Sequence, residues 1–419
     1  MAQQTINIGT ADAKQGDNLF TGGNKINDNF TELYTSVNAN PVVFVTSESS
    51  FLTQDATTIT LESGVVYEMA ESVTTAKRFI CENNSLIRSY AQSTEAVLTY
   101  TGAGDMFSGT NVSPTIKEMK IDCPSGQAFN FKDTISNTSF LFIDNITVIS
   151  CAKLGTFTNM GGFVLNRSAA ADATDGISLV GSNFGIFSVS LSAINSTSAS
   201  FIAVDYGSAI LQTNEITNLN SDAPVGSIWL SGLANSGNVP AGKLAMVTNC
   251  ELGPDIAPTQ NIVNSDIRWD FQGNNRIPDS ITDAMASLTS NVTETVITTI
   301  NTPVKVAGTW VIEREARFIV DATGRLTYIG ERDIVLPLDA TITINSASGT
   351  NKDITGYIAL NGSIINNSQV ISRVGATDPR NISLHWQQNM STNDYIELFV
   401  ENNSDTINLV ASHAINRAR

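Results

Sequence analysis

The sequence predicts a mainly β protein with a short N-terminal helix, a parallel β-helix-like body and a C-terminal jelly-roll head. Three observations support this class. Charged residues make up only 15% of the 419 residues, against roughly 25% in an ordinary soluble domain, and Ser, Thr, Asn and Gly take their place. Short β-branched runs end at Gly, Asn or Ser turns along most of the chain, and one such run recurs every 22 residues.

The charge balance narrows the possible partners. The chain has 40 acidic and 23 basic residues, and its net charge is −17. A polyanion of this size is repelled by phosphate backbones and anionic membranes, which disfavours nucleic-acid binding. No run of 18 apolar residues occurs, so we expect no membrane insertion. The first ten residues, MAQQTINIGT, lack a signal-peptide pattern, which predicts synthesis in the cytoplasm without a signal peptide.

Residues 1–40 combine a turn-rich segment with a predicted helix. An apolar stripe of Ile26, Phe30, Leu33, Tyr34 and Val37 follows helical spacing. Asn40-Pro41 is a stop signal at the end of this stripe. A helix of about four turns with one apolar face is not stable alone, so it needs a partner.

The same residues carry a family resemblance. The pattern Ile6-x-Ile8-Gly9, then Gly16-Asp17-x-Leu19, then Lys25-Ile26-Asn27-x-Asn29-Phe30-x-Glu32-Leu33-Tyr34 resembles the N-terminal module of bacteriophage tail fibres and tailspikes. In that family the module precedes a variable distal body and docks the fibre onto the virion. The resemblance implies that residues 1–40 attach to tail or other virion proteins. The matching positions are Ile6, Ile8, Gly9, Asp17, Leu19, Ile26, Asn27, Phe30, Leu33 and Tyr34.

Residues 41–277 are expected to form a shaft. Three similar runs begin at Met119, Leu141 and Phe163, in steps of 22 residues, and a fourth begins one step earlier at Val97. A repeat of this length is about one coil of a parallel β-helix. An array of β-sandwiches is the main alternative.

Residues 278–302 are predicted to be a neck between shaft and head. Pro278-Asp279-Ser280 is a helix-start signal. The following Ile281, Met285, Leu288 and Val292 have the 4-3-4 spacing of a short coiled-coil seam.

Residues 303–419 are predicted to form the head. They contain eight short β-like runs separated by turn signals, which is typical of a sandwich or jelly roll. The patterns at 393–402 and 356–362 resemble the trimeric heads of the tumour necrosis factor and complement type. This resemblance implies a homotrimer, in which threefold packing would bury faces that remain apolar in one chain.

Two groups of carboxylates are candidates for sugar chemistry. In the 22-residue register, Asp122 and Asp144 would lie on adjacent rungs about 4.8 Å apart, near the spacing of a retaining glycosidase pair. An ordinary turn ladder is the alternative. Asp266 and Asp270 flank Trp269, but four residues of strand span about 13 Å, which is too far for catalysis. Trp269 is then expected to be a core or interface aromatic, and a platform for a sugar ring is the alternative.

The head offers one candidate receptor contact. The segment 372–380 has the composition of an exposed loop, and Arg373, Asp378 and Arg380 are its charged residues. A solvated turn is the alternative. In the run after it, alternation puts His385 and Gln387 on one face and Trp386 on the other, buried face.

The cysteine spacing and the sequence motifs give no sign of a disulfide, a catalytic residue, a cofactor or a metal site. The four cysteines, Cys81, Cys123, Cys151 and Cys250, form no paired motif and are expected to be core residues. No nucleotide-binding, hydrolase, zinc or calcium motif occurs, so we assign no catalytic residue, cofactor or metal.

The function predicted from the sequence is that of a structural virion component. A phage tail fibre or spike would attach through its N-terminus and bind a host-surface glycan or protein through its distal domains. Two alternatives stay open: a tailspike depolymerase that cleaves host polysaccharide, and a fibre that decorates the capsid.

Overall fold

The computed structural model describes residues 21, 24–26, 41–90, 96–135, 138–180, 186–190, 192–196, 200–204, 213–221, 228–232, 244–253, 257–260, 262, 266–349 and 351–419. The chain forms two compact units, each described by itself below. The first comprises Met1–Gln212, Ile216–Ser231 and Leu252–Pro258, and the second comprises Thr213–Glu215, Gly232–Glu251 and Thr259–Arg419.

Strands dominate both units. Those with the parallel pairing of a solenoid are β1 (Val42–Val45), β2 (Thr53–Gln54), β3 (Thr58–Leu61), β4 (Val66–Met69), β5 (Val73–Thr75), β6 (Arg78–Cys81), β7 (Leu86–Ser89), β8 (Val97–Tyr100), β9 (Asp105–Thr110), β10 (Thr115–Lys132), β11 (Phe140–Thr158), β12 (Gly162–Asn166), β13 (Ala169–Val180), β14 (Ile186–Ser190), β15 (Ala193–Ser196), β16 (Ser200–Val204), β17 (Thr213–Thr217), β18 (Asn220–Ser221), β19 (Ile228–Gly232), β20 (Ala245–Thr248), β21 (Glu251–Leu252), β22 (Ala257–Gln260) and β23 (Trp269–Gln272). Within this group the short β2 pairs antiparallel with β3.

The head strands are β24 (Asp283–Leu288), β25 (Glu294–Thr295), β26 (Val304–Lys305), β27 (Val311–Ala316), β28 (Phe318–Val320), β29 (Leu326–Tyr328), β30 (Ile334–Ser346), β31 (Lys352–Leu360), β32 (Ser363–Ile364), β33 (Val370–Val374), β34 (Arg380–Met390), β35 (Tyr395–Asn402) and β36 (Leu409–Ala418). Two single turns of 3-10 helix, Glu48–Ser50 and Asn366–Ser368, are also present.

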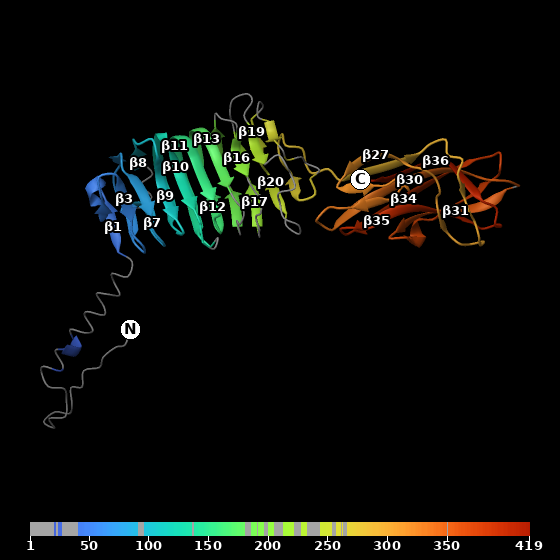
Figure 1. The fold of residues 1–419 in the computed structure, drawn as a ribbon, viewed down its shortest axis with the longest axis horizontal. Coiled ribbons are helices and arrows are strands. Elements are labelled where there is room, and N and C mark those ends of the chain that lie inside the picture. The colour runs from blue at the N-terminus through green and yellow to red at the C-terminus, as the bar shows by residue number, and fades with distance from the viewer. Residues whose placement is uncertain are drawn as a thin grey trace, which may run out of the picture. The chain divides into compact units, whose positions relative to one another are not determined.

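The first unit is a parallel β-solenoid, as the sequence predicted (Figure 1). Successive coils lie in register, so that Val66 is paired with Val42 on one side and with Leu86 on the other. Coil length varies: Val66 and Leu86 are 20 residues apart, whereas Leu86 and its next partner, Thr115, are 29 apart. The mainly β fold with a solenoid body is therefore confirmed, although its repeat is irregular.

The predicted 22-residue period holds for one of its three steps and fails for the other two. Val97 is paired with Lys120, one residue beyond Met119. Leu141 is paired with Phe163, as predicted, but Met119 is paired with Ile146 and not with Leu141. An extra loop after β10 lengthens this coil. The buried Asp133 holds the loop by accepting hydrogen bonds from the backbone N–H groups of Ile135 and Ser139, each at 2.9 Å.

Aromatic stacking fills the solenoid where coils have different lengths. Phe79, Phe107 and Phe129 are register partners on β6, β9 and β10, and all three are almost fully buried. Their ring centroids are 5.1 Å and 5.9 Å apart, and both pairs are stacked. Each ring removes a large apolar surface from water and aligns the next coil.

All four cysteines are buried and free, which confirms their interpretation as core residues. Cys123 and Cys151 are register partners on β10 and β11. Burial raises the pKa of the Cys81 thiol, which keeps it protonated and unreactive.

One solenoid corner uses the left-handed backbone conformation in three stacked residues. Lys117, Asp144 and Asn166 are register partners on successive coils. The residues directly after them, Glu118, Asn145 and Arg167, have φ values of 53°, 53° and 48°. This conformation is uncommon for residues other than Gly and Asn. At Arg167 an ion pair with the neighbouring Asp144 offsets part of the cost, and the same ion pair raises the pKa of Arg167.

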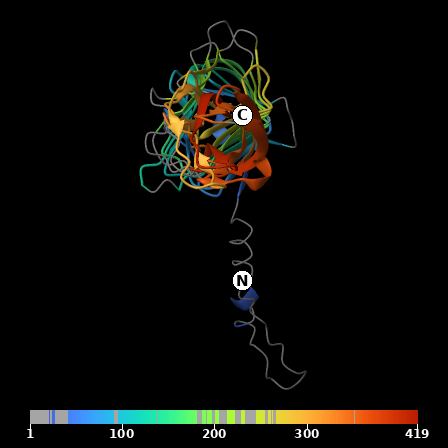
Figure 2. The same ribbon diagram turned by 90° about the vertical axis from the view of Figure 1, so that its right-hand side faces the viewer.

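The head is a sandwich of two antiparallel sheets, drawn in orange to red in Figure 1 and Figure 2. One sheet has the order β27-β24-β36-β30-β34, with β25 beside β36, and the other has the order β28-β29-β35-β31-β32. Their inner faces enclose one apolar core, which includes Leu338, Ile342, Ile358 and Leu398. All eight runs predicted in 303–419 contain strands. Jelly-roll topology itself remains a prediction.

The predicted helical neck is wrong. The apolar residues from Asp283 to Leu288 form strand β24, which pairs antiparallel with both β27 and β36. Ala284 and Ala286 are completely buried in the head core, so alternation every second residue prevails over the 4-3-4 spacing. Ile281 and Val292 are instead exposed. Tertiary pairing with the last strand of the chain decides the conformation here.

Arginines of the head also contact the last described coil within the second unit. Arg317 is 9% exposed and donates hydrogen bonds to the Trp269 carbonyl and, at 2.9 Å, to Ser280 Oγ. Arg332 Nη1 lies 2.6 Å from Asp270 Oδ2. Buried partners of this kind fix β23 to the beginning of the head.

The aromatic stack provides a test of the solenoid core. We expect Phe107→Ala to lower the free energy of unfolding by about 3–5 kcal/mol, because it removes a buried ring and leaves a cavity between two others. Thermal or denaturant melts followed by circular dichroism measure the effect. Ile135→Ala is the control, since Ile135 is 79% exposed and its loss should change stability by less than about 0.5 kcal/mol. Equal melts for the two variants would contradict the assigned register.

Candidate functional site

The predicted attachment residues can be only partly located. Ile6, Ile8, Gly9, Asp17, Leu19, Asn27, Phe30, Leu33 and Tyr34 lie outside the described residues. Ile26 is helical, as predicted, and is 43% exposed. Attachment through these side chains therefore stays a prediction.

The predicted carboxylate pair is wrong. Asp144 is paired with Lys117 and Asn166, whereas Asp122 is paired with Thr99 on β8. The longer coil between β10 and β11 shifts the two carboxylates out of one row. Each then has a structural partner: Ser150 Oγ donates to Asp122 at 2.6 Å.

Asp144 belongs to a polar ladder that holds coils together. Its carboxylate is 7% exposed, accepts a hydrogen bond from Asn166 at 2.9 Å and pairs with Arg167. Ser190 donates in turn to Asn166 at 3.0 Å. A carboxylate satisfied on both oxygens by its own strands is a structural group, which favours the turn-ladder interpretation.

Trp269 is a core aromatic. Its side chain is 1% exposed and stacks on Phe271 with ring centroids 6.0 Å apart. Asp270 is buried in its ion pair with Arg332. These side chains offer no open sugar platform, so the core interpretation is confirmed.

The charged residues of segment 372–380 form two separate exposed ion pairs. Arg373 Nε lies 2.8 Å from Asp353 Oδ1, and Arg380 Nη2 lies 2.8 Å from Asp378 Oδ2. The four side chains are 46% to 66% exposed. The hydrogen bond and charge of Arg373 lower the pKa of Asp353, so this carboxylate stays ionised at neutral pH. The loop is thus exposed and charged, as predicted.

These pairs lie at one end of the head. Strand β30 begins just after Arg332 and runs 13 residues to Ser346, a length of roughly 40 Å. Arg380 is paired with Ile344 near the far end of β30. Asn345 also donates to the carbonyl of Ala376 at 3.3 Å. We call the end that carries residues 347–349, 351–353, 373–380 and 403–408 the head tip.

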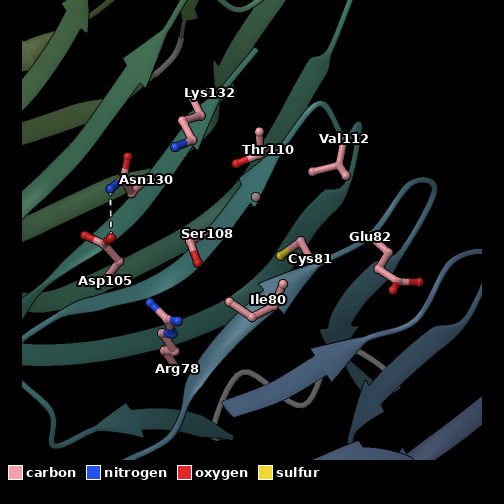
Figure 3. A pocket seen from close by; sticks show the side chains of 11 residues that line it. Arg78, Ile80, Cys81, Glu82, Asp105, Ser108, Thr110, Val112, Asn130 and Lys132 are labelled. Carbon is pink, nitrogen blue, oxygen red and sulfur yellow. Dashed lines mark hydrogen bonds between the residues drawn. The ribbon is translucent and has the colours of Figure 1, made fainter. Parts of the chain in front are cut away.

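A groove in the solenoid was not predicted. It has a volume of about 480 Å³ and is formed by β6, β9, β10 and the turns beside them (Figure 3). Polar side chains of Arg78, Asp105, Ser108, Asn130 and Lys132 line it, as Figure 3 shows. Glu82, Thr110, Ile80 and Val112 complete most of the wall.

Hydrogen bonds fix the acidic side chains of this groove. Asn130 Nδ2 donates to Asp105 Oδ2 at 2.7 Å, and the backbone N–H of Ser63 donates to Glu82 Oε2 at 2.9 Å. Parallel pairing brings three lining residues side by side, since Ser108 on β9 is the register partner of Ile80 on β6 and of Asn130 on β10. Sequence patterns alone do not indicate this site, because its three strands are separated by unequal steps of 28 and 22 residues.

Within the described part of the chain, no three His, Cys, Asp or Glu side chains come together in a way that suits a metal ion. Among the same residues, no helix is long and apolar enough to cross a membrane.

Comparison with known families identifies the N-terminal region. The sequence model of the bacteriophage T4 gp9/10-like protein N-terminal family matches residues 3–73. The match includes every predicted attachment residue and continues through strands β1 to β4 of the solenoid. A comparison with curated proteins gave no match.

Solved structures share parts of the architecture at low identity. The enzymatically active domain of bacteriophage CBA120 tailspike protein 4 has 11% identity and a TM-score of 0.22, over 84% of this chain and 63% of its own. Rabbit GITRL has 9% identity and a TM-score of 0.21, over 32% of this chain and 92% of its own. Murine APRIL at pH 8.5 has 10% identity and a TM-score of 0.23, over 33% and 99%. These scores are too low to support an argument.

The family match concerns the N-terminal region, and most of the β-solenoid follows it in the chain. The family match over residues 3–73 and the β-solenoid body support the predicted resemblance to bacteriophage tail fibre and tailspike proteins.

Proposed function

We propose that this protein is a tail fibre or tailspike that attaches to the virion through its N-terminal region and binds a host-surface glycan or protein through its distal domains. The match of residues 3–73 to a phage gp9/10-like N-terminal family is the observation that carries this proposal. The head tip supports the second half, because exposed loops on a rigid sandwich are suited to recognition. A fibre placed on the capsid is the alternative location.

We further propose a homotrimer. The sheet that contains β27, β36 and β30 exposes Val311, Ile415 and Val335, which are 52%, 40% and 56% exposed in the single chain. A closed threefold assembly would remove such side chains from water. Three copies would also raise a weak affinity of each head for the cell surface.

The oligomeric state can be measured on the purified full chain. We expect light scattering to give a mass of three 44.7 kDa chains. Replacing Val335 with Glu should shift the mass toward that of one chain, because it would bury an unpaired charge in the assembly. A native chain that stays at 44.7 kDa when concentrated would contradict the trimer.

Adsorption to host cells tests the head tip. We expect a chain with Arg373→Glu and Arg380→Glu to lose about tenfold or more of its affinity for cells, because exposed arginines are frequent binding hot spots. Fluorescently labelled full chain, titrated onto cells of the host strain, gives this affinity.

The matched control for that experiment is Arg314→Glu. Arg314 is also exposed and ion-paired, with Asp283 at 2.7 Å, but it lies away from the head tip. Because β27 belongs to the sheet proposed to face the other copies, light scattering must first show that this variant keeps the mass of the native chain. Exposed ion pairs contribute about 0–1 kcal/mol, so all variants should melt like the native chain. If the double variant adsorbed as strongly as the native chain, the head tip would not be part of the binding surface.

A depolymerase is the second candidate function. The observation that favours it is the presence of two carboxylates, Asp105 and Glu82, in one solenoid groove. If the groove cleaves glycan, host polysaccharide incubated with the chain should release new reducing ends, and Asp105→Asn should abolish the release. No release by a chain that adsorbs to the same cells would leave binding as the function. Release by Asp105→Asn at the native rate would exclude this groove as the catalytic site.

A further inference from the structure

His385 lies on the outward side of the head sheet that has the order β27-β24-β36-β30-β34. Alternation along β30 turns Asp339 outward, and His385 on β34 is its register partner. The two side chains are in contact, with 2.8 Å between His385 Nδ1 and Asp339 Oδ1. The imidazole is otherwise open, since 73% of the His385 side chain is exposed in the single chain. We call this side of the sheet, around His385, the outer head face.

The outer head face combines exposed apolar side chains with a hollow. Ile415 on β36 and Val335 on β30 are 40% and 56% exposed. A hollow of about 210 Å³ lies beside them and is lined in part by Met285, Ile415 and His385. Apolar groups around a hollow are suited to packing against a second surface, because the contact removes them from water.

The charged groups around His385 are balanced without it. Asp339 Oδ2 lies 3.5 Å from Arg419 Nη2, so the carboxylate that contacts His385 already has a cation beside it. Asp283 is paired with two arginines in the same way. In the described strands of this sheet and the residue after β36, the outer head face carries three carboxylates and three guanidinium groups, namely Asp283, Glu313 and Asp339 with Arg314, Arg417 and Arg419.

Two other charged side chains of these strands are directed elsewhere. Glu315 on β27 accepts a hydrogen bond at 2.6 Å from the backbone N–H of Val320, which belongs to the other sheet. Arg380, at the start of β34, is paired with Asp378 at the head tip. The balance of three carboxylates and three guanidinium groups therefore describes the surroundings of His385 on every strand beside it.

A balanced face of this kind is suited to a second copy of the same chain. The whole chain has a net charge of −17, so acidic surfaces of two copies repel each other. The outer head face avoids this repulsion while His385 is neutral, and its apolar side chains gain from burial. Charge balance and exposed apolar groups together favour other copies of the chain as the occupant.

We propose that the outer head face is the contact between copies of the chain and that protonation of His385 weakens this contact in acid. The inference rests on the proposed homotrimer and names its regulation. Imidazole is the side chain that ordinarily changes its charge between pH 5 and 8. A protonated His385 adds a cation to a set that is already balanced, and each copy brings one. Burying unmatched charge is costly, so assembly is complete above this titration and weakens as the pH falls.

Light scattering of the purified full chain in a series of urea concentrations tests the inference. Urea is uncharged and leaves the ion pairs unscreened, and carboxylates ordinarily stay ionised at pH 5.5. We expect the mass of three 44.7 kDa chains at pH 7.5, and dissociation of this trimer at a lower urea concentration at pH 5.5. At one fixed urea concentration, the chain concentration that gives half assembly should rise at least tenfold between the two pH values.

Variants locate the response. His385→Gln should lose most of it, because an amide can donate to Asp339 without a charge. His385→Arg should dissociate at pH 7.5 as readily as the native chain does at pH 5.5, because its charge is permanent. Circular dichroism melts check that the variants fold.

The matched control is His413→Gln. His413 is also exposed and lies on β36, but its ring contacts Ser412 and no carboxylate of the balanced set. Its register partner, Thr343, is four residues along β30 from Asp339, about 13 Å away and beyond the range of unscreened charge at physiological salt. This variant should keep the native response to pH.

The outcomes separate this inference from the proposed function. A native chain of 44.7 kDa at pH 7.5 would overturn the homotrimer and the acid response together. A trimer that dissociates at the same urea concentration at both pH values would overturn the acid response alone. The same conclusion would follow if His385→Gln responded like the native chain, or if His413→Gln lost the response. Adsorption to host cells at pH 7.5 tests host binding independently of all these results.

Discussion

In-register parallel pairing of successive coils is the constraint on which the rest of the solenoid depends. Each coil buries one row of side chains on the next, so Phe79, Phe107 and Phe129 must occupy equivalent positions although 28 and 22 residues separate them. Variation in coil length is absorbed in turns outside the rows, such as the loop held by Asp133. Both the core and the outer polar rows follow from this register.

The register also separates structural polar groups from candidate functional ones. Asp144, Asn166 and Ser190 bond to one another along a row and leave no capacity for a ligand. In the groove the carboxylates are occupied in the same manner.

The head has a different organisation with a different physical cause. Its antiparallel strands pair over long sequence distances, and β24 joins the last strand, β36, across more than a hundred residues. That pairing explains why a helix-like spacing at Ile281, Met285, Leu288 and Val292 misled the sequence prediction. Apolar residues at alternating positions were also present, and burial of Ala284 and Ala286 against the second sheet made that pattern decisive.

The sequence by itself determined the composition-driven β class, the buried cysteines, the strands of the head and the inward side of Trp386, because these depend on local alternation and polarity. It also identified the phage module, because that motif is contiguous. Only the tertiary structure decided the pairing of Asp122 and Asp144, the strand in place of the neck helix, and the groove. Those features depend on which residues face each other across coils of unequal length, and a one-residue change in register moves a side chain to the opposite face.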